Sequence, residues 1–245
     1  MRTPVVLSLA SLVALVLSQA LSAQSGSFTV TQLGKQVGTA TFSFNPAKDG
    51  YDSTSKVKVS MKGLEYAFSK TEQLSSANEL RYVQLSATVN GSAVSIVGVP
   101  ESSQFMLNIS ASGRTSTARV AAHPGAVFMP DFDPGALETL LALGISRNNH
   151  DLWAIFPKQS GSEAATTSQI QLATYPDEQG TLNGQPVAVH HLVANIAGTS
   201  TDLFSGPENQ LLQAELPQQG FALIRNGFVL KPPAKPGSAP PPEQQ

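Results

Sequence analysis

The sequence predicts a single, mainly β domain: a strongly curved antiparallel sheet, an open or half barrel, with one short helix. Apolar residues alternate with Ser, Thr and other polar residues over most of the 245-residue chain, which is the pattern of strands with one buried face. Gly, Asn, Asp and Pro separate these segments at short intervals. Some twelve to fourteen short strands joined in this way favour one antiparallel sheet that is bent or closed.

The first 23 residues are predicted to be a secretory signal peptide. Arg2 precedes a charge-free, mostly apolar run from Val5 to Leu17, and small residues follow as far as Ala23. A run of about 13 residues is shorter than the roughly 20 apolar residues that a membrane helix needs. We therefore expect export to the periplasm or the extracellular space, with a mature chain that starts near Gln24 and contains no transmembrane span.

The first half of the predicted sheet follows the leader. Its first two strands lie around Phe28–Val30 and Val37–Phe44. The next six are predicted at Lys56–Met61, Leu64–Leu74, Leu80–Val89, Ala93–Val99, Phe105–Ile109 and Arg114–Val120. Asn90-Gly91 predicts a tight hairpin, because a two-residue type I′ turn needs positive φ at both positions and this pair tolerates it.

The middle of the chain interrupts the strand pattern. Residues 123–133 are rich in Pro and irregular, and leucines at helical spacing then predict a helix over Pro134–Leu143. Asp133 is expected to cap the free amides, Pro134 suits the first helical position, and Gly144 is expected to end the helix in a left-handed conformation. We expect this helix to plug the open side or one end of the curved sheet.

Strand patterning resumes after the helix and stops before a Pro-rich end. The predicted strands are Leu152–Phe156, Ser168–Tyr175, Val187–Ile196, Ser200–Phe204, Leu211–Leu216 and Phe221–Leu230, with turns predicted at Asp177–Gly180 and Asn183-Gly184. Residues 232–245 lack the apolar content that ordering requires and are predicted to be a disordered tail. The predicted domain therefore spans residues 24–231.

Composition excludes several classes of function. The chain carries 15 basic and 17 acidic residues, a formal charge of −2, and its Lys and Arg residues are scattered. Nucleic-acid binding and electrostatic attachment to a membrane both need clustered basic residues. The absence of cysteine excludes disulfides, thiolate metal sites and a cysteine nucleophile. An export signal without cysteine favours a bacterial envelope or secreted protein, since eukaryotic extracellular modules usually carry disulfides.

Both ends of the predicted domain resemble a known kind of domain. Gly26–Val30 with Gly34–Ala40, and Asn209–Pro217 with Phe221–Arg225, are similar to the first hairpin and the last two strands of uncharacterised exported bacterial domains. Those domains share the open curved sheet of the lipoprotein-carrier group, in which a helix sits in the concave face. The resemblance implies this architecture and a concave apolar surface for a greasy ligand. It assigns no functional residue.

The candidate chemical residues are few. His190 and His191 are neighbours in a predicted strand and point to opposite faces, so one of them is expected to be a hydrogen-bonded structural histidine rather than a metal ligand. His123 is a further candidate because histidine is scarce, and His150 belongs to a polar loop. Asp131 and Asp133 flank Phe132, and paired carboxylates suit acid–base chemistry or a cation. Helix capping by Asp133 and solvation of Asp131 explain the pair more simply.

Two further patterns have ordinary explanations. Ser53 precedes Lys56 by three residues, but this S-x-x-K lies in strand sequence, whereas the penicillin-binding motif needs a buried helix. Leu64, Tyr66 and Phe68 share one strand face, as do Trp153 and Ile155. Such rows usually form a core, although they can also line a pocket.

We therefore expect a monomer without catalytic residues, cofactor or metal, which binds an apolar or amphiphilic molecule in the concave face as an envelope carrier or scavenger. The residues that contact this ligand are not predicted. One alternative is an envelope adaptor that holds a protein partner through a sheet edge or its tail. Another is a hydrolase, which requires Asp131 and Asp133 to converge with His190 or His191.

Overall fold

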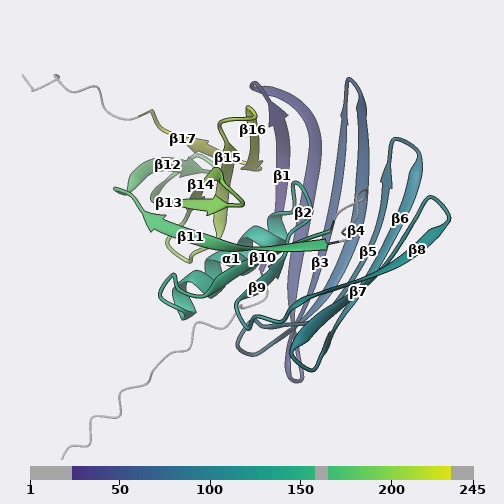
Figure 1. Ribbon diagram of the computed structural model, residues 1–245. Helices are drawn as coiled ribbons and strands as arrows, with labels where there is room; N and C mark the ends of the chain where they lie inside the picture. Colours follow the sequence, from purple (N-terminus) through teal and green to yellow (C-terminus); the bar gives the residue numbers. More distant parts are fainter. Residues whose placement is uncertain (1–23, 158–164, 233–245) are drawn as a thin grey trace, which may run out of the picture.

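The computed structural model describes residues 24–157 and 165–232. The predicted signal peptide and the predicted tail from residue 233 onward lie outside the described residues. Seventeen strands and one helix make up the described part (Figure 1). The strands before the helix are β1 (Gln24–Gln32), β2 (Lys35–Ala47), β3 (Gly50–Met61), β4 (Leu64–Ser75), β5 (Leu80–Val89), β6 (Ser92–Glu101), β7 (Gln104–Ala111), β8 (Arg114–Ala121) and β9 (Ala126–Phe128).

The helix, α1, spans Pro134–Ser146. The strands after it are β10 (Leu152–Pro157), β11 (Ala165–Thr174), β12 (Glu178–Leu182), β13 (Gln185–Ile196), β14 (Thr199–Ser205), β15 (Leu211–Leu216), β16 (Phe221–Arg225) and β17 (Phe228–Leu230). The mainly β class with one helix is therefore confirmed.

The strands form one large curved sheet that is not closed into a barrel. Its order is β9-β10-β11-β13-β14-β15-β16-β1 and then β2 to β8 in sequence. β9 pairs with β10 in parallel, and the other recorded pairs are antiparallel. Among the described residues, β8 and β9 each pair on one side only and so form the two ends. β12 joins the first half of β13 to β17 in a small flap.

The main core lies on the concave side of the long strands β1–β8, where α1 is enclosed (Figure 1). In register across the sheet, Phe28, Ala40, Val57 and Phe68 form one row of inward residues, and each is buried. The outward residues of these strands are mostly Ser, Thr, Gln and Lys. This alternation matches the period-two pattern from which the strands were predicted.

Local turn chemistry correctly places several hairpins. Asn90 and Gly91 have φ of 48° and 82°, so both central residues of the β5–β6 turn have the positive φ that a type I′ turn requires. The expected turn at Asn183-Gly184 is confirmed in the same way, with φ of 51° and 79°.

Four details of the sequence prediction are wrong. Residues 126–128 form strand β9 within the stretch expected to be irregular, and residues expected as a turn at Asp177–Gly180 mostly belong to β12. The single strand expected over Phe221–Leu230 is divided by a turn at Asn226-Gly227 into β16 and β17.

The fourth error concerns the end of the helix. α1 continues through Gly144 to Ser146, so Gly144 does not end it. A Cβ at Gly144 would lie 2.9 Å from Leu172 Cδ2 and 3.0 Å from Asn149 Oδ1. Glycine is therefore explained here by close packing against β11 and not by a left-handed cap.

Candidate ligand-binding site

α1 is buried on nearly all sides, which makes it the centre of the candidate site. Ten of its 13 residues are buried, and it contacts β2 and β3 on one side and β9, β10 and β15 on others. A helix that is apolar all round is typical of a protein interior. The helix therefore fills the concavity, and a ligand in the concave face would lie beside it.

A buried group of charges joins the start of α1 to the sheet. Lys70 Nζ on β4 lies 2.8 Å from Glu72 Oε2 and 2.5 Å from Asp133 Oδ2, and all three side chains are at most 2% exposed. Ser55 and Ser53 on β3 are buried directly opposite Lys70 and Glu72. We call Lys70, Glu72 and Asp133 the Lys70 cluster.

Asp133 has two roles in this cluster. Its Oδ1 accepts a hydrogen bond of 2.9 Å from the Gly135 amide, so it is the helix cap that the sequence predicted. Its Oδ2 pairs with Lys70, a contact that was not predicted from the sequence. One carboxylate therefore fixes both the first turn of α1 and its position on the sheet.

Burial and charge act against each other within the cluster. Desolvation, the largest single effect, lowers the pKa of Lys70, but Asp133 and Glu72 outweigh it and the net pKa is raised. Desolvation raises the pKa of Glu72, and Lys70 counteracts this only in part. Two carboxyl groups therefore share one ammonium group, and burial favours the protonated form of Glu72.

The start of α1 also requires close contact with β3. A Cβ at Gly135 would overlap the Ser55 hydroxyl and would lie 3.4 Å from Phe42 Cβ. Glycine at this position lets the helix backbone approach the sheet closely enough for Asp133 to reach Lys70.

Glu138 provides a second link, at the middle of α1. Its Oε1 accepts a hydrogen bond of 2.9 Å from the Leu211 amide and lies 3.1 Å from Arg225 Nη2. Desolvation raises the pKa of Glu138 to about 7, although the Leu211 amide and Arg225 both lower it. The Arg225 guanidinium also lies over the Phe28 ring, 5.2 Å from its centroid.

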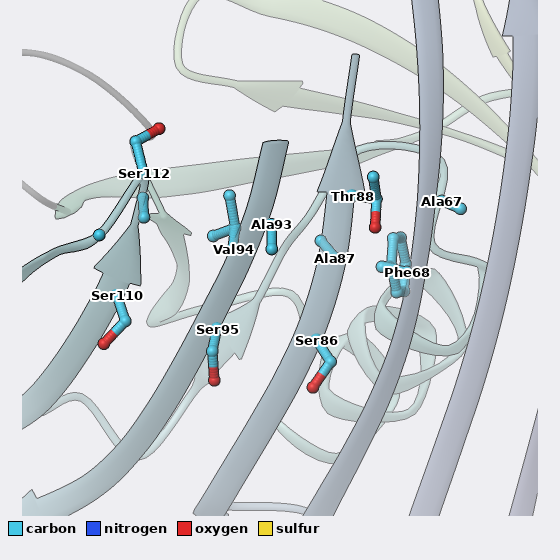
Figure 2. Close-up of a pocket in the computed structure, with 12 residues that line it drawn as sticks. Ala67, Phe68, Ser86, Ala87, Thr88, Ala93, Val94, Ser95, Ser110 and Ser112 are labelled. Carbon is cyan, nitrogen blue, oxygen red and sulfur yellow. The ribbon is translucent and has the colours of Figure 1, made fainter. Parts of the chain in front are cut away.

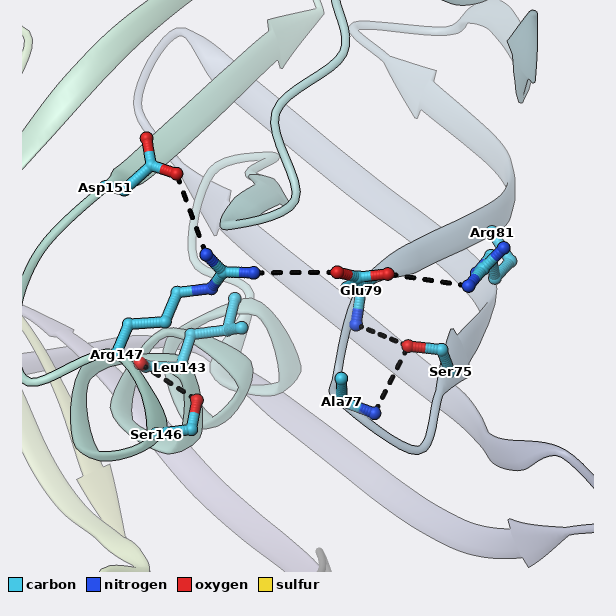
Figure 3. A network of polar contacts seen from close by, with 8 residues as sticks. All are labelled: Ser75, Ala77, Glu79, Arg81, Leu143, Ser146, Arg147 and Asp151. Atoms are coloured by element: carbon cyan, nitrogen blue, oxygen red, sulfur yellow. Dashed lines mark hydrogen bonds and ion pairs between the residues drawn. The ribbon is translucent and has the colours of Figure 1, made fainter. Parts of the chain in front are cut away.

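The residue after α1 provides the third link, at the surface (Figure 3). Arg147 lies 3.6 Å from Glu79, in the β4–β5 turn, and 3.6 Å from Asp151. Ser75 Oγ accepts the amides of Ala77 and Glu79 and holds that turn in shape. Because these ion pairs are partly exposed, each contributes at most about 1 kcal/mol.

A pocket of about 220 Å³ opens beside the first turn of α1. We call it the α1 pocket. Its walls come from the segment before α1, from α1 itself and from β10, β13, β14, β15 and β16. Its larger apolar lining residues are Met129, Phe132, Leu137, Phe156, Ile196, Leu216 and Leu223.

The polar residues that line the α1 pocket are either acidic or uncharged. Among the described residues that line it, Asp131 and Asp133 are the ionisable ones, beside Thr199, Thr201 and Gln219. Asp131 is exposed to solvent, as predicted, and no hydrogen bond or ion pair to its side chain is recorded among the described residues. The surrounding protein raises the pKa of its carboxyl group by desolvation. An apolar pocket with a few polar groups is the usual form of a small-molecule site.

Phe132 forms part of this pocket in an unusual backbone conformation. Its φ is 60°, a region that bulky residues rarely adopt. Its ring packs against Phe221, with centroids 5.0 Å apart, and lies 6.4 Å from the ring of Tyr66. Burial, followed by the charges of Asp131 and Asp133, raises the pKa of the Tyr66 hydroxyl. These aromatic contacts hold Phe132 at the pocket wall.

A second hollow, of about 620 Å³, lies over the ends of β4–β7 (Figure 2). Small side chains of Ser, Thr and Ala make up most of its lining, and Phe68 and Val94 are its larger apolar residues. None of its described lining residues is charged. Despite its volume, it has fewer large apolar side chains than the α1 pocket and no recorded carboxylate to orient a ligand, so it is the weaker candidate.

The histidines and aspartates of the expected hydrolase site do not meet. His190 lines a different hollow, with Gly144 and Asn148 near the end of α1, whereas Asp131 and Asp133 lie at its start. A helix of 13 residues is about 20 Å long. The hydrolase alternative required these histidines and aspartates to converge, and that prediction is therefore wrong.

The histidines have other partners instead. His190 Nδ1 lies 3.0 Å from Asp177. His191 Nε2 lies 2.9 Å from Asp202, and its ring stacks on Phe204 with centroids 4.6 Å apart. His191 is thus the hydrogen-bonded structural histidine that the strand pattern predicted.

The remaining candidates have structural surroundings. His123 stacks on Trp153, with centroids 3.7 Å apart, and His150 is exposed in the loop after α1. Ser53 is buried on β3 whereas Lys56 is exposed on the opposite face, so the two do not form the S-x-x-K arrangement of a serine enzyme. Tyr66 and Phe68 belong to the core.

Lys70 and Glu72 were not predicted as site residues, although the sequence contains a signal for them. Tyr66, Phe68 and Leu74 are inward residues of β4, and Lys70 and Glu72 occupy the same alternating positions. Charged residues in phase with an apolar row are the mark of a buried ion pair, because inward positions are otherwise apolar.

The chain matches no family model, no curated protein and no solved structure. The resemblance to the lipoprotein-carrier group therefore stays a prediction. Within the described ranges, no helix is long and apolar enough to cross a membrane. The same residues contain no group of three or more His, Asp or Glu side chains arranged to hold a metal ion.

Proposed function

We propose that this protein binds one small apolar or amphiphilic molecule in the α1 pocket, as an exported carrier or scavenger. The observation that carries the proposal is the pocket itself, whose walls are mostly apolar and whose rim holds Asp131, Thr199 and Gln219. Such sites bind by removing apolar surface from water and orient the ligand through a few polar groups. Export rests on the predicted signal peptide.

The size of the pocket limits the ligand. Small-molecule sites usually have about 300–1,000 Å³, so a volume of about 220 Å³ suits one short alkyl chain or one ring. A larger amphiphile would place only one end here. The links that hold α1 against the sheet keep the pocket formed without a ligand.

A binding measurement with a matched pair of variants tests this proposal. We expect n-octanol to bind the wild-type protein saturably in calorimetric titration. Leu216→Trp should fill the pocket from a half-buried position and weaken binding at least tenfold. Val229→Trp, at an exposed site on β17, should leave binding unchanged. Native mass spectrometry after mild purification should show a co-purified small molecule on the wild-type protein.

Two results would overturn the proposal. One is a protein that emerges free of ligand and takes up no n-octanol. The other is equal binding by the Leu216→Trp and Val229→Trp variants, both folded as judged by their unfolding temperatures.

The adaptor alternative stays a prediction. Its Pro-rich tail lies beyond residue 232, outside the described residues. A pull-down from envelope extract with and without residues 232–245 would test it.

A further inference from the structure

We propose that the α1 pocket selects amphiphiles with a positively charged head, such as an ammonium group, over equally long amphiphiles with a carboxylate head. This inference rests on the proposed function and names the chemical class of its ligand. In the bound arrangement, the apolar end lies among Leu137, Ile196 and Leu223, and the head pairs with Asp131 at the rim.

The charges around the pocket favour a cation. Asp131 and Asp133 line it, and Glu72 lies behind it in the Lys70 cluster. Against these three carboxyl groups stands, among the described residues of the pocket and the Lys70 cluster, the ammonium group of Lys70, which is already paired with Glu72 and Asp133. Arg225 is likewise paired with Glu138. Asp131 therefore remains as the charge without a recorded counter-ion among the described residues that line the pocket.

The partial positive charge at the N-terminus of α1 opposes the preference for a cation only weakly. A helix N-terminus carries a partial charge of about +0.5 and attracts anions through its free amides. Here the Asp133 carboxylate is placed on those amides and accepts from Gly135. The position that an anionic ligand would use is thus already filled by the chain itself.

Aromatic rings beside the carboxylate add to the preference. Phe132 follows Asp131 directly, lines the pocket and packs against Phe221. The face of an aromatic ring attracts cations, so a carboxylate next to such a ring suits an ammonium head. A carboxylate head would meet the like charge of Asp131, and none of the described residues that line the pocket offers it a positive charge.

Three probes of equal chain length separate this inference from the proposed function. n-Octylammonium, n-octanol and n-octanoate should each be titrated at pH 7 and low salt. An exposed ion pair contributes up to about 1 kcal/mol, which is about a fivefold change in affinity. We expect the ammonium to bind about two- to fivefold more tightly than the alcohol, and the carboxylate more weakly than the alcohol by a similar factor.

A matched pair of variants assigns the preference to Asp131. Asp131→Asn should abolish the difference between ammonium and alcohol while leaving the affinity for n-octanol within twofold. Asp52→Asn removes an exposed carboxylate from the outer face of β3 and should change none of the three affinities. Raising the salt concentration should reduce the preference of the wild-type protein, because screening weakens exposed pairs.

The outcomes are distinct. If n-octanoate binds as tightly as n-octylammonium, or if Asp131→Asn leaves the preference intact, the inference is wrong although the pocket binds alkyl chains. If none of the three probes binds, the proposed function fails together with the inference.

Discussion

Removal of Lys70 should destabilise the protein more than removal of either carboxylate that it contacts. In a Lys70→Met variant, Glu72 and Asp133 would both remain buried with no ammonium group between them. Loss of one partner from a buried ion pair costs about 3–5 kcal/mol, because an uncompensated charge stays in the interior. This is a large part of the roughly 5–15 kcal/mol that stabilises a typical domain.

The two carboxylates predict a rank order of effects. Glu72→Gln leaves a one-to-one pair of Lys70 and Asp133, and burial already raises the pKa of Glu72; we expect a loss of at most about 1 kcal/mol. Asp133→Asn keeps a capping side chain for Gly135 and leaves Glu72 to pair with Lys70. Its cost should be intermediate, about 1–3 kcal/mol.

Urea unfolding at pH 7 measures this order. Circular dichroism and Trp fluorescence follow the transition, and its midpoint and slope give the free energy of unfolding of each variant. A loss below about 1 kcal/mol for Lys70→Met would refute the reasoning. So would a Glu72→Gln variant as unstable as Lys70→Met, since the cluster would then not be an ammonium group shared by two acids.

Two other predictions follow from the links between α1 and the sheet. The pKa of Glu138 near 7 lies above its ordinary 4.5, so the folded state holds this proton more tightly. The resulting stability is fully present below about pH 4.5 and is lost as the pH rises through 7, by about 3 kcal/mol. Glu138→Gln should remove this part of the pH dependence, and an unchanged difference between pH 4.5 and pH 8 in urea unfolding would count against it. Gly135→Ala should lower stability by about 1–3 kcal/mol through overlap with Ser55, and Ser55→Ala should restore part of it; equal losses in both backgrounds would argue against this contact.

The fold class could be predicted because its signals are local. Alternation of apolar residues defines the inward face of most strands, and pairs such as Asn90-Gly91 define the hairpins between them. The same signal was present at Asn226-Gly227, where the chain turns between β16 and β17. The error there was one of interpretation and not of missing information.

The other errors have a different origin, because they depend on distant parts of the chain. β9 has three residues and forms through its parallel pairing with β10, a strand that follows α1 in the chain. A Cβ at Gly180 would meet the Phe228 ring at 2.7 Å, so this glycine serves packing of the flap and not a turn. Such contacts between distant segments cannot be predicted from the spacing of residues in the sequence.

The candidate site was only partly predictable. Helix capping by Asp133 follows from its position before Pro134, but its pairing with Lys70 requires the register of β4 against the helix. Likewise, the α1 pocket gathers Phe132, Ile196 and Leu223 from segments about 30 to 90 residues apart, whose juxtaposition only the folded sheet creates.

The central claim is that an alkyl chain enters the α1 pocket, and methyl NMR spectroscopy tests it most directly. With the methyl groups of Leu137, Ile196 and Leu223 assigned, titration with n-octanol should shift these three resonances saturably. The methyl groups of Val94, beside the hollow over β4–β7, should stay in place. Shifts at Val94 alone, or no saturable shift at the three pocket residues, would contradict the account.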